Sequence, residues 1–204
     1  MKILMMHPHD IYSPSEPWTT RIRNLAFQLV KKGNSVKLVY FPLNGDGIGK
    51  RRIDSGFEVI PLSRKLGIAV LLRNCRELLR LGEWADIIHF QKCYYYVALP
   101  AMVASLLKNK PVHYDWDDWE TKIFYYSNPK QYIVGEFINI FEKLIPKAAD
   151  TVSVASEYLK KSCIRRGVSE NNIFFAPVGA DLSEFKPSQK LAGIIKKKYN
   201  IKVL

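Results

Sequence analysis

The chain has 204 residues, of which 48% are hydrophobic and 25% charged, a balance typical of a soluble protein with its own core. Three separated cysteines without a C-x-x-C pair argue against a disulfide framework and favour a reducing compartment. The net charge of +12 indicates an anionic partner, whether nucleic acid, a phosphorylated ligand or a membrane surface. The longest apolar run, 94–107, is shorter than the roughly 20 residues of a membrane span, so we expect a cytoplasmic protein.

Apolar runs and helical patterns alternate along most of the chain. In chain order the expected strands are 2–6, 36–41, 57–62, 86–90, 112–114, 151–155 and 173–177. The expected helices are 18–32, 64–81, 94–107, 131–147 and 157–166, with Gly33 and Gly82 ending the first two. Loops are expected at 44–55, which is glycine-rich, and from 115 to about 129, which is acidic and aromatic. This alternation predicts a Rossmann-like α/β fold, a doubly wound and mostly parallel sheet of about seven strands with helices on both faces.

The pattern changes after Phe185. A helix is expected over 191–199, and the apolar residues 201–204 resemble the first residues of a strand. We therefore expect one Rossmann-like domain over 1–186, and over 187–204 a linker and the start of a second domain.

Ligands of doubly wound sheets bind at the carboxyl ends of the strands, near the point where the strand order reverses. The loops that begin at His7, Gln91, Asp115, Ser156 and Val178 are therefore expected to line the site.

The segment 110–121, KPVHYDWDDWET, places four carboxylates and two tryptophans directly after an apolar strand. Four carboxylates in six residues repel one another, so water, cations or a hydroxyl-rich ligand must solvate them. Carboxylates beside aromatic rings are typical of sugar recognition. The alternative is a solvated acidic loop in which Trp116 and Trp119 only pack.

Two further motifs are weaker. The segment 44–50, NGDGIGK, lacks the spacing and the Ser or Thr of a P-loop, so a flexible loop is favoured. His7 and His9 would lie on one face of a strand, and with His89 and His113 they would allow a zinc site. Because buried histidines are more often only hydrogen-bonded, no metal site is expected.

The segments 150–160 (DTVSVASEYLK) and 172–187 (NIFFAPVGADLSEFKP) resemble the end of the N-terminal domain in retaining GT-B glycosyltransferases of family 4. The resemblance covers about residues 1–187. It implies the acceptor-binding half of a two-domain enzyme, whose C-terminal domain would bind most of the nucleotide-sugar. The chain alone is then expected to be inactive, and no cofactor besides this co-substrate is implied.

The resemblance also indicates site residues. By spacing, Asp117 and Asp118 stand where many members have a His-Asp pair, and Glu16 stands where many have glycine. Asp117 and Asp118 are therefore the candidate catalytic residues, and we expect their side chains at the surface. Arg21 is expected to bind a phosphate. The candidate substrate-binding residues are His9, Glu16, Trp18, Arg21, Gln91, Trp116, Trp119, Ser156, Gly179 and Asp181.

The function expected from this resemblance is transfer of a sugar, with retention, from a nucleotide-sugar to a phosphorylated, lipid-linked or polysaccharide acceptor. Two alternatives stay open. A nucleic-acid-binding module would explain the charge, but the sequence carries no motif of that kind, so no nucleic acid is expected. A stand-alone binding or accessory protein of the same fold is the other.

Arg73, Arg76 and Arg80 recur at helical spacing beside a leucine-rich face. A basic amphipathic helix of this kind can lie on an anionic membrane, so we expect these arginines to contact the inner face of the membrane. The alternative is an ordinary solvated helix face.

Overall fold

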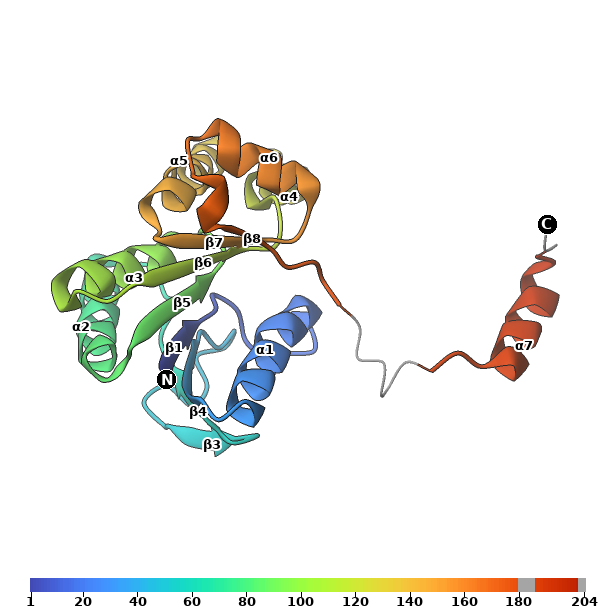
Figure 1. Ribbon diagram of the computed structural model, residues 1–204, viewed down its shortest axis with the longest axis horizontal. Helices are drawn as coiled ribbons and strands as arrows, with labels where there is room; N and C mark the ends of the chain where they lie inside the picture. Colours follow the sequence, from blue (N-terminus) through green and yellow to red (C-terminus); the bar gives the residue numbers. More distant parts are fainter. Residues whose placement is uncertain (180–185, 202–204) are drawn as a thin grey trace.

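The computed structural model describes residues 1–179 and 186–201, and within them it confirms the α/β fold (Figure 1). One sheet has the strand order β3-β4-β2-β1-β5-β6-β7-β8. All neighbouring strands are parallel except β3 and β4. The order reverses between β1 and β5, as in a doubly wound sheet. The strands are β1 (Lys2–Met6), β2 (Ser35–Tyr40), β3 (Arg52–Asp54), β4 (Phe57–Pro61), β5 (Ile87–Gln91), β6 (Val112–Trp116), β7 (Thr151–Val154) and β8 (Ile173–Phe175).

The described sheet has one strand more than predicted. The additional strand, β3, lies in the glycine-rich region that was expected to be a loop. It pairs antiparallel with β4 through Ser55 and Gly56, whose φ angles of 50° and 88° match the two-residue turn that favours hairpins. Because β3 has only three residues and two of them are exposed, the sequence shows no alternation there.

The predicted helices occur in the predicted order with different ends, and one further helix, α4 (Glu120–Ser127), lies in the segment from 115 to about 129 that was expected to be a loop. Gly33 ends the first helix as predicted, with a φ of 80°. Gly82 does not end the second helix, which continues to Trp84 and packs there on the following helix. A Cβ at Gly82 would be in ordinary van der Waals contact with that following helix, 3.6 Å from the Ala104 Cβ. The helices are α1 (Thr20–Lys31), preceded by a 3-10 turn (Pro17–Thr19), α2 (Ile68–Trp84), α3 (Tyr95–Lys108), α4 (Glu120–Ser127), α5 (Tyr132–Ala148), α6 (Glu157–Arg165) and α7 (Gln189–Tyr199).

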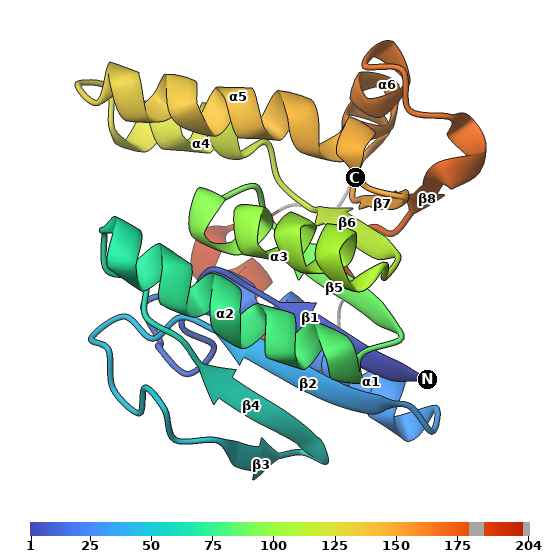
Figure 2. The same cartoon turned by 90° about the vertical axis from the view of Figure 1, so that its left-hand side faces the viewer.

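Alternate strand residues point to opposite faces of the sheet, and each face has its own core. On one face α1 packs over β1, β2 and β4, with Ile22 and Ala26 buried. On the other face α2, α3, α5 and α6 form a layer, which Figure 2 shows from outside. No helix of the described chain is long and apolar enough to cross a bilayer.

The end of the chain is set apart from this α/β body. Every described residue from 186 to 201 is exposed, and α7 lies well away from the sheet in Figure 1. Ile201 is not in a strand, and the rest of the predicted strand start, 202–204, lies outside the described residues. The predicted domain boundary after residue 186 stays a prediction.

Glu142 of α5 joins three elements through one buried carboxylate. It accepts hydrogen bonds from the Trp116 indole N–H of β6 (3.1 Å) and from the backbone N–H groups of Glu120 (2.8 Å) and Thr121 (3.1 Å). The Thr121 hydroxyl also donates to it. The first N–H groups of a helix have no partner within the helix, so Glu142 supplies the partner that holds the start of α4 against the sheet.

Replacing Glu142 by Ala should lower the free energy of unfolding by about 3 kcal/mol or more, because it leaves several buried donors unsatisfied. Urea denaturation measures this loss. The control is Glu83→Ala, which removes an exposed ion pair with Lys108 and should lower the free energy of unfolding far less. Equal losses for the two variants would contradict this role of Glu142.

Candidate functional site

The carboxyl ends of β1, β5 and β6 bring the predicted polar residues to one place. His7 follows β1, Gln91 ends β5, and Asp117 follows β6. The register pairs Gln91 with Asp115, so the acidic segment begins beside the end of β5. This is the edge where the strand order reverses, and ligands of such sheets bind there.

The sequence predicted that Arg21 binds a phosphate, but in the structure its guanidinium is paired with Asp115. Its guanidinium holds Asp115 with two bonds of 2.9 and 3.0 Å and also donates to the carbonyls of Ala176 (2.9 Å) and Pro177 (3.3 Å). Burial would raise the pKa of Asp115, but Arg21 and the Ser153 hydroxyl hold it below its usual value. Arg21 thus joins α1 to β6 and to the segment after β8.

Lys92 is the residue that sequence reasoning missed. Its buried ammonium lies 2.5 Å from Glu120, 2.9 Å from Asp118 and 3.4 Å from Asp117. Burial would lower the pKa of Lys92, but the three carboxylates raise it, so the ammonium stays charged. These carboxylates are close enough together to hold a metal ion, and the ammonium already lies among them. The cation that the acidic segment requires is thus a side chain of the protein.

Asp117 is buried rather than at the surface, since its side chain is only 6% exposed against 44% for Asp118. It accepts a hydrogen bond from Gln91 Nε2 at 2.7 Å. Burial raises the pKa of Asp117 to about 7, with Lys92 opposing the rise and the neighbouring carboxylates adding to it. A carboxyl with this pKa can both accept and return a proton near neutral pH.

On one side of β6, the next two strands also end in buried polar residues, Gln91 at the end of β5 and His7 after β1. Within the described chain, Gln91 Oε1 and both ring nitrogens of His7 are buried without a hydrogen-bond partner. Burial, His9 and Lys92 lower the pKa of His7 well below its usual value although the Gln91 side chain opposes the shift, so the ring is neutral. Buried polar groups are normally satisfied, and such exceptions point to a site that a ligand or water completes.

A second polar group lies after β1. His9 Nδ1 is 3.0 Å from Glu16, which also binds the Arg64 guanidinium at 3.1 Å. Burial would raise the pKa of Glu16, but hydrogen bonds from His9, the Asp10 N–H and Arg64 lower it to about 2. Trp18 packs edge-on against the His9 ring, with centroids 5.4 Å apart. Glu16 is therefore an ionised side chain that orients His9.

The other predicted residues are not all in the site. Trp116 was expected to offer a face to a sugar, but it is 1% exposed, because it alternates with Asp115 and points into the core. Trp119 is half-buried and stacks on Tyr158 at 4.8 Å. Ser156 accepts a hydrogen bond from the N–H of Leu159 and caps α6. Gly179 is exposed, and Asp181 lies outside the described residues.

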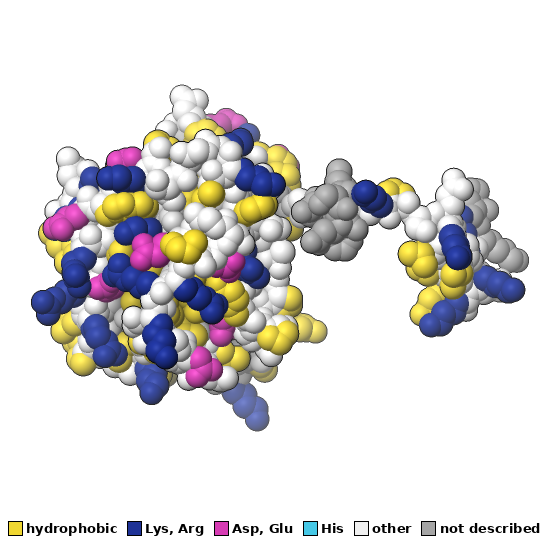
Figure 3. All heavy atoms as spheres, turned by 90° about the horizontal axis from the view of Figure 1, so that it is seen from below, with side chains coloured by type: hydrophobic (Ala, Val, Ile, Leu, Met, Phe, Trp, Pro, Cys, Tyr) yellow, Lys and Arg dark blue, Asp and Glu magenta, His cyan; other side chains and the backbone are white. Residues whose placement is uncertain are grey.

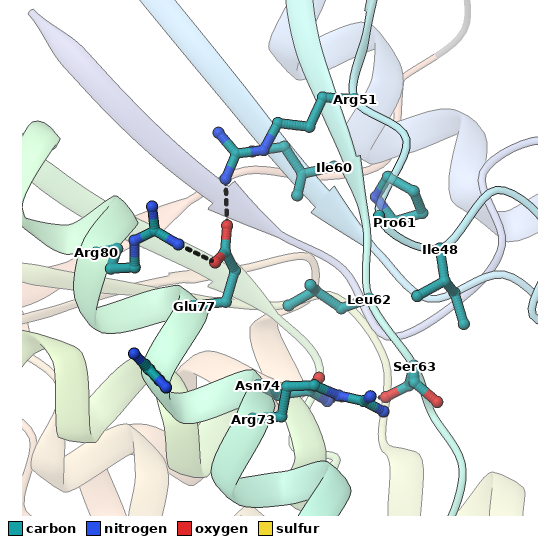
Figure 4. A pocket seen from close by; sticks show the side chains of 12 residues that line it. Ile48, Arg51, Ile60, Pro61, Leu62, Ser63, Arg73, Asn74, Glu77 and Arg80 are labelled. Atoms are coloured by element: carbon teal, nitrogen blue, oxygen red, sulfur yellow. Dashed lines mark hydrogen bonds and ion pairs between the residues drawn. The ribbon is translucent and has the colours of Figure 1, made fainter.

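The three arginines predicted to contact a membrane lie elsewhere, on the outer face of α2. Arg73, Arg76 and Arg80 are exposed and line a cavity of about 510 Å³ together with Arg51 (Figure 4). Glu77 pairs with Arg51 and, at 3.4 Å, with Arg80. On the face seen in Figure 3, Lys and Arg side chains are spread out rather than gathered in one stripe.

A mostly parallel sheet of this order, with polar groups converging at its carboxyl edge, defines a Rossmann-like domain of the GT-B type. Residues 19–184 match the sequence profile of Glycosyltransferase Family 4. The chain belongs to this family of glycosyltransferases, as its closing segment indicated. A comparison with curated protein sequences gave no match.

Solved structures share this fold over most of the chain. Alr3699/HepE from Anabaena, in complex with UDP, matches with a TM-score of 0.63 at 13% identity, over 98% of this chain and 50% of that protein. Sucrose-phosphate synthase from Thermosynechococcus elongatus matches with a TM-score of 0.62 at 16% identity, over 99% of this chain and 53% of that protein. UDP-N-acetylglucosamine 2-epimerase from Rickettsia bellii matches with a TM-score of 0.60 at 15% identity, over 99% of this chain and 52% of that protein. At such identities the likeness shows the fold alone, and the chain spans about half the length of these proteins.

Replacing Arg21 by Ala should lower the free energy of unfolding by about 3–5 kcal/mol at neutral pH, because it leaves the Asp115 carboxylate buried without its cation. The partly exposed pair of Arg23 with Asp54 (3.5 Å) gives the control, and Arg23→Ala should cost less than about 1 kcal/mol. The pKa of Asp115 is lowered in the folded protein, so the contribution of the pair is lost as the pH falls through that value. In urea unfolding, the difference in free energy of unfolding between wild type and Arg21→Ala should therefore become smaller in acid. A difference that does not depend on pH would contradict the role given to the Arg21–Asp115 pair.

Proposed function

We propose that the chain is the acceptor-side domain of a glycosyltransferase and that Asp117 acts on the acceptor hydroxyl. The observation that carries the proposal is a buried carboxyl at the carboxyl edge of the sheet whose pKa is raised to about 7. The side-chain amide of Gln91 supports it, since it donates a hydrogen bond of 2.7 Å that holds the carboxyl in place at the strand end. Asp118 is the more exposed neighbour and would contact the same acceptor.

The proposed step is a substitution at the anomeric carbon of the donor sugar. The Asp117 carboxylate takes the proton of the acceptor hydroxyl, whose oxygen forms a bond to that carbon. The bond from the same carbon to the terminal phosphate oxygen breaks, and the nucleoside diphosphate leaves. By the family resemblance the product keeps the anomeric configuration of the donor.

The donor is proposed to be a nucleotide-sugar bound mainly by a second domain. Alr3699/HepE has been solved with UDP and with UDP-glucose, and this chain covers half of that protein. Catalysis requires donor and acceptor to be held together in reacting geometry. The 204 residues alone are therefore proposed to be inactive.

The acceptor is proposed to carry an anionic group, as a phosphorylated, lipid-linked or polysaccharide chain does. The cavity at Arg51, Arg73 and Arg76 supports this, because within the described chain Arg73 and Arg76 have no acidic partner. Guanidinium groups bind phosphate oxygens in a two-pronged geometry. A lipid-linked acceptor would place the protein in the cytoplasm, peripherally on the inner face of the membrane.

In the complete enzyme, Asp117→Asn should lower kcat by about a hundredfold or more, the usual contribution of a positioned acid or base. Asn keeps an oxygen that can accept the hydrogen bond from Gln91, so KM should change little. In the wild type kcat should rise between about pH 6 and 8, as Asp117 loses its proton, and this rise should vanish in the variant.

Because Asp117 is buried, the melting temperature of the variant has to be compared with that of the wild type. The matched substitution Asp118→Asn removes the neighbouring charge, which is more exposed than Asp117, and should lower kcat far less. Full activity of a folded Asp117→Asn protein would remove Asp117 from the reaction.

A further inference from the structure

Helices α4 and α5 form an antiparallel pair with an apolar outer surface. Ile133, Phe137, Ile140 and Leu144 recur at intervals of four, three and four residues, so they form one stripe along α5. All four are exposed, Ile133 to 84%. In the last turn of α4, next to the loop between the helices, Tyr126 is 92% exposed. The stripe and Tyr126 are called here the α4–α5 surface.

The pair is held in a fixed arrangement. Glu142 binds the start of α4, and the Tyr125 hydroxyl of α4 donates to Glu136 of α5 at 2.5 Å. Gly135 lets the Tyr125 ring lie directly on α5, since a Cβ at Gly135 would lie only 2.3 Å from that ring. The apolar stripe is therefore presented to the outside by packing on the opposite side of α5.

The exposed charges around the α4–α5 surface are mostly positive. Lys122, Lys143 and Lys147 are exposed on the two helices, and Lys130 is exposed in the turn between them. Of the carboxylates in the same segment, Glu120 binds Lys92 and Glu142 is buried, whereas Glu136 stays partly exposed and accepts a hydrogen bond from Tyr125. Apolar side chains with a tyrosine at the turn and lysines around them are typical of helices that lie in a membrane interface.

We propose that the α4–α5 surface binds an anionic phospholipid bilayer, with the stripe in the acyl boundary and the lysines at the lipid phosphates. The charge pattern favours a lipid over a protein, because each lysine near an anionic leaflet adds attraction. In Figure 2 the α4–α5 turn and the first turn of α2 both lie on the left-hand side. This inference rests on the peripheral membrane association proposed above. It makes the α4–α5 surface, rather than the arginines of α2, the main contact with the membrane.

Vesicle sedimentation of the 204-residue chain tests the proposal without any activity measurement, so its failure leaves the proposed transfer reaction untouched. The chain should sediment with vesicles of phosphatidylcholine and phosphatidylglycerol, and much less with phosphatidylcholine alone. Ile133→Asp and Phe137→Asp should each weaken binding by about tenfold or more, because they place a charge in the acyl boundary.

The matched control is Leu106→Asp on α3, which changes an equally exposed leucine (81%) outside the surface and should leave binding unchanged. Ile133→Asp and Leu106→Asp change well-exposed side chains and should keep the wild-type melting temperature and circular dichroism. Phe137 is half-exposed and packs against Tyr95 and Phe141, so Phe137→Asp counts only if its circular dichroism shows a folded protein. Ile133→Trp should bind at least as well as the wild type.

Three results would overturn the proposal. One is a chain that stays in the supernatant with anionic vesicles. A second is binding that the triple replacement of Arg73, Arg76 and Arg80 by Glu abolishes while Ile133→Asp does not. The third is a dimer in vesicle-free buffer that Ile133→Asp dissociates, because the stripe would then be an interface between two chains.

Discussion

The site depends on one buried ammonium group. Four carboxylates within six residues can share a sheet edge because two cations are buried among them, Arg21 beside Asp115 and Lys92 beside the other three. Lys92 has a φ of 67°, an uncommon conformation for a side chain of this size, which the surrounding contacts must hold in place. Through Glu120 the same ammonium also contacts the first turn of α4. The position of α4 and the protonation of Asp117 therefore both depend on Lys92.

The α/β fold could be predicted because alternating apolar strands and amphipathic helices are local patterns. The strand β3 and the helix α4 could not, since β3 has three mostly exposed residues and α4 starts on a carboxylate from α5, 22 residues further on. Charge compensation is also non-local. Arg21 and Asp115 are 94 residues apart, and no spacing rule connects them.

Two errors in the site had a local signal. Strand alternation places Tyr114 and Trp116 on one face and Asp115 on the other, so an apolar core under Trp116 could have been predicted. Lys92 directly follows Gln91 at the end of β5, one residue beyond a predicted site position. The burial of Asp117 had no such signal, because it results from how Gln91, Lys92 and Glu120 close around it.

The central claim is that the Asp117 carboxyl exchanges its proton near neutral pH. A carboxyl-carbon NMR titration of the 204-residue chain measures it directly, with Asp117→Asn to assign the signal. The account predicts a pKa of about 7 for Asp117, a higher value in Lys92→Met, and a lower one in Asp118→Asn. A value in the ordinary aspartate range of about 4, unchanged in both variants, would contradict it.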